Sequence, residues 1–454
     1  MKRILATIGV VILGAVSFHA VAATPPAATR MLPMPLLQRC DVVQAAGVRM
    51  EAQVPEAGMV LCEKDPRRPA LWYAPSASRT LEDGTVQIWY QRVNKEETSY
   101  ADQRTLCLGE IRNGSWALPA VQPGSPAWGG ANNVVMIRSP HRPTWGGFNV
   151  FQIVADRAGL AMLYWDQPGP TGEAGALRAV SRDGRSWEKL PGAVFTEHND
   201  AFCLLRVGDE YLAYQTALEP WPDKPVADNI GKLKRVISLR ASPDLKTWSL
   251  QQPLLAPDAR DAPDAEFYLF KVFRYGHGYA GLIMKYYADP AKPGKHSAIL
   301  RHELAVSEDG RTWQRPYRDT ELGFWSYADP FPVNGRMHFA TWKDGALATV
   351  ACEQDRLVAV TGEGSFSTPP FARPKNGIAL NADASQGWIE TTLCDRGGKP
   401  ASGVDSQRIE GIEGTSIPLP WKHNELPEEC SLRIRLGGGA KVYCVAEQSI
   451  RTIQ

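Results

Sequence analysis

The sequence carries almost no net charge, since 50 Lys and Arg residues stand against 49 Asp and Glu residues in 454 positions. A protein that binds nucleic acid by releasing counterions is normally far more basic, so this class is excluded. After its first residues the chain also lacks any apolar run long enough to cross a membrane. At 44% hydrophobic residues it is nevertheless too apolar for a disordered tail protein, and it can bury a large core.

Several catalytic and cofactor motifs are absent as well. We find no GxSxG elbow, no phosphate-binding Walker loop and no dinucleotide fingerprint, and the glycine run 437–439 lies at an expected hairpin turn. No CxxC motif or His/Cys cluster has the spacing of zinc ligands. We therefore expect neither a cofactor nor a metal site.

The eight cysteines are too scattered for a disulfide scaffold, and the chain is long enough to fold on its own core. The candidate bridges are Cys40 with Cys62, and one pair among Cys394, Cys430 and Cys444. Cys203 lies in an apolar run and is expected to be a buried small side chain rather than a nucleophile.

The N-terminus has the three parts of a secretory signal peptide. Lys2 and Arg3 give a positive start, residues 4–16 are apolar, and the small residues 20–22 suit a signal peptidase. We predict cleavage after Ala22 or Ala23 and hence a secreted or periplasmic protein without a membrane segment. The alternative is an N-terminal membrane anchor.

Turn residues and aromatic residues are abundant, with 40 Gly, 35 Pro, 14 Trp, 14 Tyr and 13 Phe, and this favours many short strands. The pattern Ser-x-Asp-x-x-(Ser/Thr)-Trp occurs at 181–187, 242–248 and 307–313, and a degenerate copy ends at Trp116. Such a repeat predicts small sheets around an axis, with each Asp turn closing a hairpin and each Trp packed between blades.

The strand pairs between these turns predict five blades. The expected pairs are 71–78 with 86–93, 148–155 with 161–166, 200–207 with 210–216, 267–275 with 280–287, and 329–333 with 337–342. Beyond 368 the alternating segments 378–381, 387–394, 431–436 and 441–447 lack the Asp-Trp phrase and predict a small β-sandwich. The expected organisation is a signal peptide (1–22), an N-terminal extension (23–59), a five-bladed β-propeller (60–368) and a C-terminal β-sandwich (369–454), all of them β structure.

This combination resembles the secreted glycoside hydrolases of families 32 and 43 and their relatives. The resemblance rests on the segments 132–135, 261–268, 380–385, 432–436 and 441–443. It implies a substrate funnel at the propeller axis, lined by the beginnings of the five innermost strands, in which carboxylates cleave a glycosidic bond. Fold alone does not specify the substrate.

Acidic residues stand where three of the innermost strands are expected to begin. On the resemblance, Glu266 is the candidate general acid and Asp200 the nucleophile or base, with Asp264 and Asp329 tuning the pair or binding sugar. A turn cap or a solvated loop charge is the structural alternative for each of them. Further substrate-binding candidates near these strand openings are His198, Tyr268, Trp325 and Tyr327.

The sequence departs from families 32 and 43 in two blades. A key acid of those families begins blade one, but here that strand starts Leu71-Trp72-Tyr73 and the nearest acid, Asp65, precedes it. In blade two, Asp156 comes at the far end of the strand and is expected in a turn. The usual set of three acids therefore cannot be copied onto this chain.

Blade two opens instead with His141, Arg142 and Trp145, a basic pair beside an aromatic ring that suits an anionic sugar. Charges at Arg67, Arg68, Lys271 and His302 are candidates to add to the same funnel. A solvated surface loop is again the alternative.

We therefore expect an exported glycoside hydrolase, a monomer whose partner is an oligosaccharide or polysaccharide. A hydrolase or lyase specific for uronic-acid glycans, and a non-catalytic glycan-binding propeller, remain the alternatives.

Overall fold

The computed structural model describes residues 29–94, 104–121, 133–141, 147–156, 159–167, 169, 174–197, 200–292 and 297–448. The predicted signal peptide lies outside these residues. The described chain is built from β-strands, with short 3-10 helices at Arg39–Asp41 and His423–Glu425. None of its helices is long and apolar enough to span a membrane.

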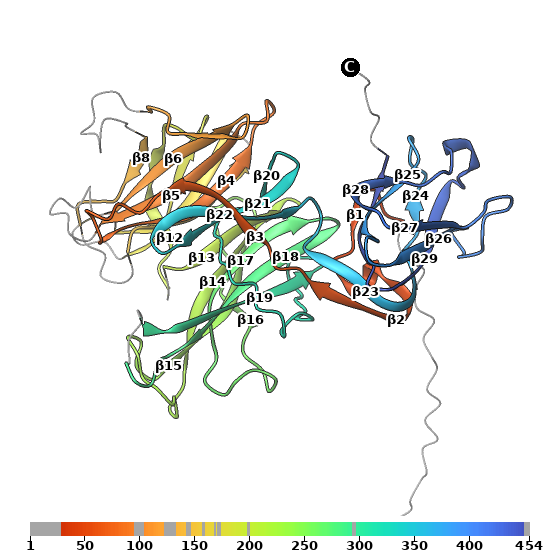
Figure 1. Ribbon diagram of the computed structural model, residues 1–454. Coiled ribbons are helices and arrows are strands. Elements are labelled where there is room, and N and C mark those ends of the chain that lie inside the picture. Colours follow the sequence, from red (N-terminus) through yellow and green to blue (C-terminus); the bar gives the residue numbers. More distant parts are fainter. Residues whose placement is uncertain are drawn as a thin grey trace, which may run out of the picture.

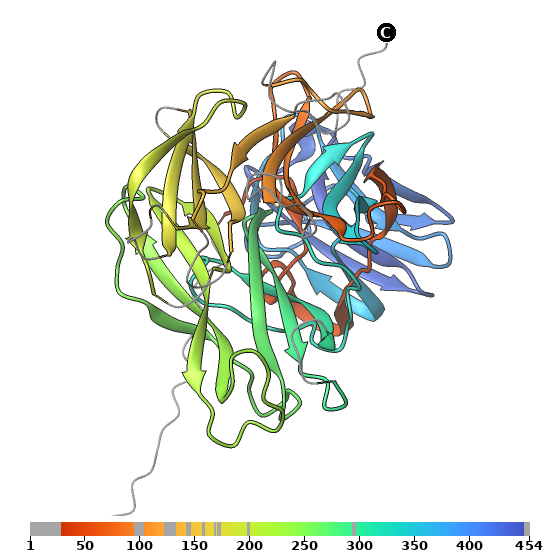
Figure 2. The same ribbon diagram turned by 90° about the vertical axis from the view of Figure 1, so that its left-hand side faces the viewer.

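Five small antiparallel sheets stand around a common axis and form a five-bladed β-propeller (Figures 1 and 2), as predicted. Blade 1 contains β4 (Leu71–Thr80), β5 (Val86–Asn94), β6 (Arg104–Arg112), β7 (Ser115–Ala117) and, beside β6, β8 (Val134–Ile137). Blade 2 contains β9 (Asn149–Asp156), β10 (Gly159–Asp166), β11 (Gly175–Ser181) and β12 (Glu188–Phe195). Blade 3 contains β13 (Phe202–Val207), β14 (Glu210–Pro220), β15 (Leu233–Ser242) and β16 (Gln252–Leu255).

Blade 4 contains β17 (Glu266–Tyr275), β18 (Gly278–Tyr287) and β19 (Ile299–Ser307). Blade 5 contains β20 (Phe331–Val333), β21 (Arg336–Lys343), β22 (Ala346–Glu353) and β3 (Glu56–Cys62). The first strand of each blade is the innermost one: β4 packs beside β9 and β20, and β13 packs beside β9 and β17.

The N-terminal segment does more than extend the propeller. Strand β3 pairs with β22, with Cys62 opposite Leu347, and so supplies the fourth strand of blade 5 from the beginning of the chain. This pairing covers an edge that β22 would otherwise expose and closes the ring. The predicted boundary at 59/60 therefore cuts through a strand that the propeller needs.

The repeated Asp turns close hairpins as predicted. In each turn the aspartate accepts hydrogen bonds from two backbone N–H groups further along, for example Asp309 Oδ1 from Arg311 (2.7 Å) and Thr312 (2.7 Å). Asp244 makes the equivalent pair of bonds. These bonds satisfy turn amides that no strand partner reaches.

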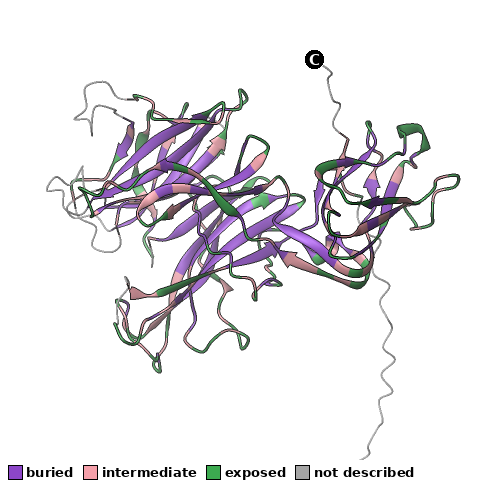
Figure 3. Ribbon diagram, viewed as in Figure 1, coloured by how far each residue is buried: buried purple, intermediate pink, exposed green. Residues whose placement is uncertain are grey.

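The tryptophans of these turns pack between neighbouring blades, again as predicted. Trp187 meets Trp89 of blade 1 edge to face at 6.5 Å, and Trp313 meets Tyr214 of blade 3 at 6.1 Å. The turns themselves are bonded across the same boundary, because Trp89 Nε1 donates to the carbonyl of Gly184 at 2.9 Å. The inner strands of the blades, such as β5 and β10, are mostly buried, whereas outer strands such as β12 are mostly exposed or half-buried (Figure 3).

One of these turns offers a test of how tightly the blades fit. Gly184 has φ +79°, and a Cβ there would lie 2.4 Å from Cζ2 of Trp89, whereas Gly192 has φ +81° and open space around it. Alanine at a left-handed position costs about 1–2 kcal/mol, and overpacking adds about 1–3 kcal/mol. We expect Gly184→Ala to lower the free energy of unfolding more than Gly192→Ala by that second amount, measured by denaturant unfolding. Equal losses would contradict the tight fit between blades 1 and 2.

The C-terminal unit is one curled antiparallel sheet that encloses its own core, much as the two layers of a sandwich would (Figure 1). Its strand order is β27 (Gln407–Glu410), β26 (Trp388–Asp395), β29 (Glu429–Gly437), β23 (Val358–Ser367), β30 (Lys441–Glu447), β25 (Ile378–Asp383) and β28 (Glu413–Pro418). Strands β1 (Met34–Pro35), β2 (Val43–Ala52) and β24 (Phe371–Ala372) pair with β30, β23 and β29. Because β23 belongs to this sheet, the sheet begins before the predicted boundary at 368/369.

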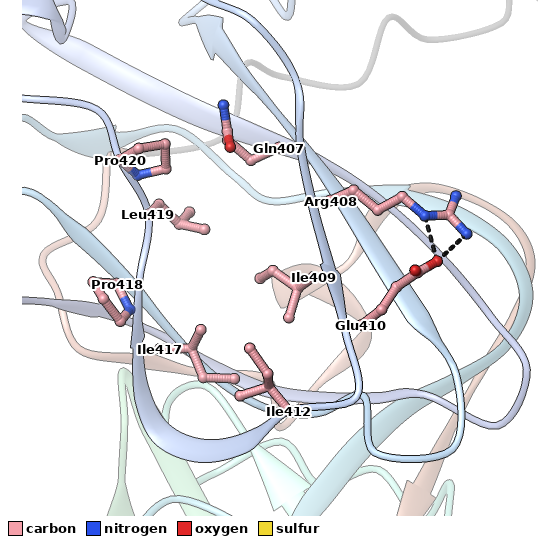
Figure 4. A pocket seen from close by; sticks show the side chains of 9 residues that line it. All are labelled: Gln407, Arg408, Ile409, Glu410, Ile412, Ile417, Pro418, Leu419 and Pro420. Atoms are coloured by element: carbon pink, nitrogen blue, oxygen red, sulfur yellow. Dashed lines mark hydrogen bonds and ion pairs between the residues drawn. The ribbon is translucent and has the colours of Figure 1, made fainter.

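The two ends of the curled sheet, β27 and β28, face each other across a groove of about 470 Å³ (Figure 4). Ile409 and Ile417 line its two sides, and Arg408 and Glu410, which also line it, pair with each other. The groove lies within the C-terminal unit and contains none of the predicted site residues.

The curled sheet contacts the propeller at the ends of the strands of blade 4. The amide of Leu357 donates to the Tyr275 hydroxyl (3.3 Å), and Tyr317 donates to the carbonyl of Leu37 (2.6 Å). Tyr275 is the last residue of β17, so this contact lies opposite the side on which the innermost strands begin.

All eight cysteines lie among the described residues, and all are free thiols. The predicted pairing of Cys40 with Cys62 and of two among Cys394, Cys430 and Cys444 is therefore wrong. Most of these thiols are buried, as Cys203 was predicted to be, and they fill the cores as small apolar side chains.

Candidate functional site

Side chains from two innermost strands and from the segment before a third meet on the propeller axis. The ammonium of Lys271, on β17, contacts Asp329 Oδ1 at 2.6 Å and donates to Gln152 Oε1, on β9, at 2.7 Å. Gln152 in turn donates from Nε2 to Asp329 Oδ2 at 3.1 Å. Asp329 stands just before β20, so blades 2, 4 and 5 hold one carboxylate between them.

Asp329 is the exposed member of this group. Its side chain is 37% exposed, whereas that of Lys271 is 1% exposed. Blade 1 adds a further anchor, because the Ser78 hydroxyl donates to the main-chain carbonyl of Asp329 at 2.6 Å. A buried ammonium needs a counter-charge, and here the counter-charge is a carboxylate that solvent can still reach.

A second group lies at the opening of blades 1, 2 and 3. Asp200, two residues before β13, accepts hydrogen bonds on Oδ2 from the amide of Gly147 (3.1 Å) and from the side chain of Asn149. Arg104, the first residue of β6, donates from one guanidinium nitrogen to Asn149 Oδ1 (2.7 Å) and to the carbonyl of Phe148 (2.7 Å). Asn149 thereby links a carboxylate and a guanidinium at the start of β9.

Aromatic rings stand beside this group. Tyr327 stacks on Trp342 with ring centroids 6.0 Å apart, and Trp325 meets it edge to face at 5.6 Å. Burial first, and then the proximity of Tyr268 and Asp200, raise the pKa of Tyr327 well above its ordinary value. Its hydroxyl therefore stays neutral and can act as a hydrogen-bond donor next to Asp200.

Of the predicted aromatic residues, Tyr268 and Tyr327 are partly exposed, but Trp325 is only 2% exposed. Trp325 lies between Tyr327 and the ring of His302, whose centroid is 6.2 Å away. It supports Tyr327 from behind rather than offering its own face to a sugar.

Glu266 begins β17 as predicted, but it does not face a funnel. Its Oε1 lies 2.7 Å from the ammonium of Lys224, and its Oε2 lies 3.0 Å from the guanidinium of Arg235 and accepts the amide of the same residue at 2.9 Å. All three side chains are 1% exposed. Asp228 completes a closed set of two cations and two anions.

This arrangement conflicts with the general-acid role predicted for Glu266. A general acid must reach the leaving oxygen of its substrate and carry a proton to it. Both oxygens of Glu266 are engaged by buried cations, and no substrate touches a side chain that is enclosed in this way. The position was predicted correctly, but its surroundings indicate a structural ion pair between blades 3 and 4.

Burial opposes the charge of Asp228, but the Tyr286 hydroxyl bond and the charge of Arg235 outweigh it and lower the pKa of Asp228 to about 2. Tyr286 donates to Asp228 at 2.7 Å. The carboxyl group of Asp228 therefore stays charged through the neutral and mildly acidic range.

Asp264 lies in the turn before β17 and is partly buried. Burial of Tyr287 raises the pKa of that residue, and the negative charges of Asp261 and then Asp264 raise it further. Asp261 forms a paired contact with Arg315 at 2.6 and 2.7 Å and belongs to a second ion network with Glu303. No described contact joins Asp264 to Asp200 or to Asp329.

His141 follows β8 in a segment that the end of β10 holds in place. Asp166 accepts the amide of Ser139 at 2.6 Å, and Ser139 Oγ accepts the amide of His141 at 3.2 Å. Burial, the largest influence, raises the pKa of Asp166 despite this bond. Three other predicted binding residues, Arg142, Trp145 and His198, lie outside the described residues.

The basic residues that were expected to add charge to the funnel divide into two groups. Lys271 reaches the axis. Arg67 is 89% exposed and, like Arg68, pairs with Asp65 in a turn. His302 contacts Glu321 at 3.4 Å, and burial lowers its pKa, so it stays neutral near pH 7. Asp156 was expected in a turn but is the last residue of β9, where it pairs with Gly159 and accepts a hydrogen bond from the Tyr211 hydroxyl.

The sequence alone did not point to Arg104 or Gln152 as members of the site. Both lie inside ordinary strand patterns, and neither is next to an acidic or aromatic motif that would mark it. Their closeness to Asp200 and Asp329 arises only when blades that are far apart in sequence close into a ring. Among the described residues no group of three or more His, Cys, Asp or Glu side chains could hold a metal ion.

No family model matches the sequence, and no curated protein matches it. The structure is distantly similar to solved propeller glycoside hydrolases. A glycoside hydrolase is 12% identical with a TM-score of 0.45, over 66% of this chain and 92% of the other. The family 32 β-fructofuranosidase of Bombyx mori is 12% identical with a TM-score of 0.39, over 88% and 94% of the two chains.

A family 117 glycoside hydrolase from the marine bacterium Zobellia galactanivorans is 12% identical with a TM-score of 0.38, over 87% of this chain and 91% of the other. These similarities are too remote to transfer a substrate or a catalytic residue.

Proposed function

We propose that the protein is an exported glycoside hydrolase in which Asp200 and Asp329 form the reacting pair of carboxyl groups. The observation that carries this proposal is Asp329, an exposed carboxylate on the propeller axis that a buried lysine and a glutamine from two other blades hold in place. Solvated turn residues do not need such an anchor. A group that must stay fixed while a substrate reacts does.

Glycoside hydrolysis uses one carboxyl group to protonate the leaving oxygen and another to attack the anomeric carbon or to activate water. Asp329 suits the second role, because the Lys271 ammonium at 2.6 Å and the Gln152 amide at 3.1 Å hold its two oxygens in a fixed orientation. Asp200 is engaged through Oδ2, and its Oδ1 has no hydrogen-bond partner among the described residues. Asp200 therefore takes the proton-exchanging role in this proposal, in place of Glu266.

The neighbouring aromatic residues suit a sugar ring. Tyr327, backed by Trp342 and Trp325, and Tyr268 are partly exposed rings beside Asp200. Rings of this kind stack on the apolar faces of sugars while their hydroxyls bond to polar groups. The N-terminal residues 1–22 support export as part of the same proposal.

The test is a panel of oligosaccharides and polysaccharides incubated with the purified mature protein, with release of new reducing ends measured for the wild type and for Asp200→Asn. The proposal expects cleavage of at least one glycan by the wild type and a loss of about 10²–10⁴-fold for Asp200→Asn. Products that absorb as unsaturated uronates would show a lyase instead. Glycan binding without any cleavage across the panel would show a binding protein, and either result overturns the proposal.

A further inference from the structure

The guanidinium of Arg104 has an unusual environment for a cation that is partly buried. Its two described hydrogen bonds leave from a single nitrogen and go to neutral acceptors, the carbonyl of Phe148 and Asn149 Oδ1. No carboxylate lies within ion-pairing distance of Arg104 among the residues that the structure describes. Among the described residues, the Arg104 guanidinium therefore has polar partners but no counter-charge in direct contact.

The neighbouring charges do not neutralise Arg104. Burial, the largest influence, lowers the pKa of Arg104; Asp200 offsets this only in part, and the positive charge of Arg138 lowers it further. Two guanidinium groups thus stand close together with one carboxylate nearby. A partly desolvated cation of this kind gains from a counter-charge that a ligand brings.

The position of Arg104 ties this surplus of positive charge to the proposed reacting group. Asn149 accepts from Arg104 and donates to Asp200, so the guanidinium and the carboxyl group are fixed by one side chain. Tyr268 and Tyr327 also contribute to the electrostatic surroundings of Arg104. A sugar stacked on those rings would bring its substituents within reach of the guanidinium.

We infer that Arg104 is a specificity residue that binds an anionic substituent of the sugar next to the scissile bond, a carboxylate or a sulfate. This inference rests on the proposed function for the sugar, and it assigns the substrate class: glycans that contain uronate or sulfated sugars. The planar guanidinium presents two parallel N–H donors to such a group, a geometry that an ammonium or a neutral side chain does not supply.

The test measures binding rather than turnover, so it is independent of whether cleavage occurs. The charged probes are glucuronic acid, galacturonic acid and a sulfated N-acetylhexosamine, and their neutral counterparts are glucose, galactose and the unsulfated N-acetylhexosamine. Each is titrated into the wild type, Arg104→Gln and Arg104→Lys and followed by ligand-observed NMR. Arg274→Gln is the matched control, because it removes the same charge from an exposed site near the far end of β17. Thermal unfolding of each variant confirms that it is folded.

The wild type is expected to bind at least one charged sugar at least tenfold more tightly than its neutral counterpart, and which one it prefers decides between carboxylate and sulfate. Arg104→Gln should abolish this preference and leave binding of neutral sugars within twofold. Arg104→Lys should keep part of the preference, and Arg274→Gln all of it. If the wild type shows no preference for charged sugars, or binds no probe, the inference is wrong.

The two proposals fail separately. If the protein hydrolyses a neutral glycan and binds charged and neutral sugars equally well, the proposed function is supported and the role of Arg104 is wrong. If the protein binds a charged sugar through Arg104 but cleaves no glycan, the subsite is supported and the proposed hydrolase activity is wrong.

Discussion

Asp329→Asn is expected to lower kcat by about 10²–10⁴-fold on any glycan that the wild type cleaves, the range typical for removal of a reacting carboxyl group. Asparagine keeps the shape of the side chain and leaves the main-chain carbonyl free to accept from Ser78. It removes the charge that the Lys271 ammonium faces at 2.6 Å. The measurement is initial rates at saturating substrate, with KM determined from the same data.

The variant also leaves Lys271 buried without its counter-charge, so a loss of stability has to be separated from a loss of chemistry. Adding Lys271→Met removes the unpaired ammonium and should recover thermal stability without recovering kcat. Asp156→Asn is the matched control, because Asp156 is at the end of β9 away from the strand's beginning at the site, and it should keep wild-type kcat. An unchanged kcat for Asp329→Asn would show that Asp329 takes no part in the reaction.

Glu266→Gln is expected to destabilise the fold by about 3–5 kcal/mol, because removing one member of a buried ion network leaves the others unpaired. Lys224 and Arg235 would share the single remaining carboxylate of Asp228. The measurement is the free energy of unfolding from urea titration at pH 7. The kcat of the protein that remains folded should stay within about threefold of the wild type, since this side chain does not touch the substrate.

Glu210→Gln provides the comparison for this loss of stability. Glu210 pairs with Arg311 at 2.6 Å, but the two side chains are 53% and 42% exposed. An exposed ion pair contributes about 0–1 kcal/mol, so this variant should be almost as stable as the wild type. Similar stability of the two variants would argue against a closed network around Glu266.

The propeller could be predicted from the sequence because its turns are local. An aspartate that bonds the amides two and three residues ahead, as Asp309 does, leaves a fixed phrase in the sequence. The tryptophan that ends each phrase packs against the preceding blade, so the spacing of the phrases indicates how many blades there are. The C-terminal β unit was predicted from strand alternation alone.

Features that depend on distant pairing were not predictable in the same way. Strand β3 carries no turn phrase that would mark it as part of blade 5, and β23 reads like one more propeller strand although it pairs with β2 and β29. Their partners lie far away in the sequence. The register between them is set by closure of the ring and of the curled sheet.

The same limit explains the prediction for Glu266. Its place at the start of β17 follows from the local pattern and is correct, but its role depends on Lys224 and Arg235, which come from the loop and strand of a different blade. Asp329 is the reverse case. Its neighbours Lys271 and Gln152 come from two further blades, and only the closed ring shows that they anchor it on the axis.

The most direct test of the central claim compares kcat for Asp329→Asn and Glu266→Gln on one substrate, with each rate corrected for the fraction of folded protein. The claim that the reaction takes place at the axis, with Asp329 and Asp200, predicts a loss of about 10²–10⁴-fold for Asp329→Asn and a change within about threefold for Glu266→Gln. The opposite result, with Glu266→Gln inactive and Asp329→Asn active, would contradict it.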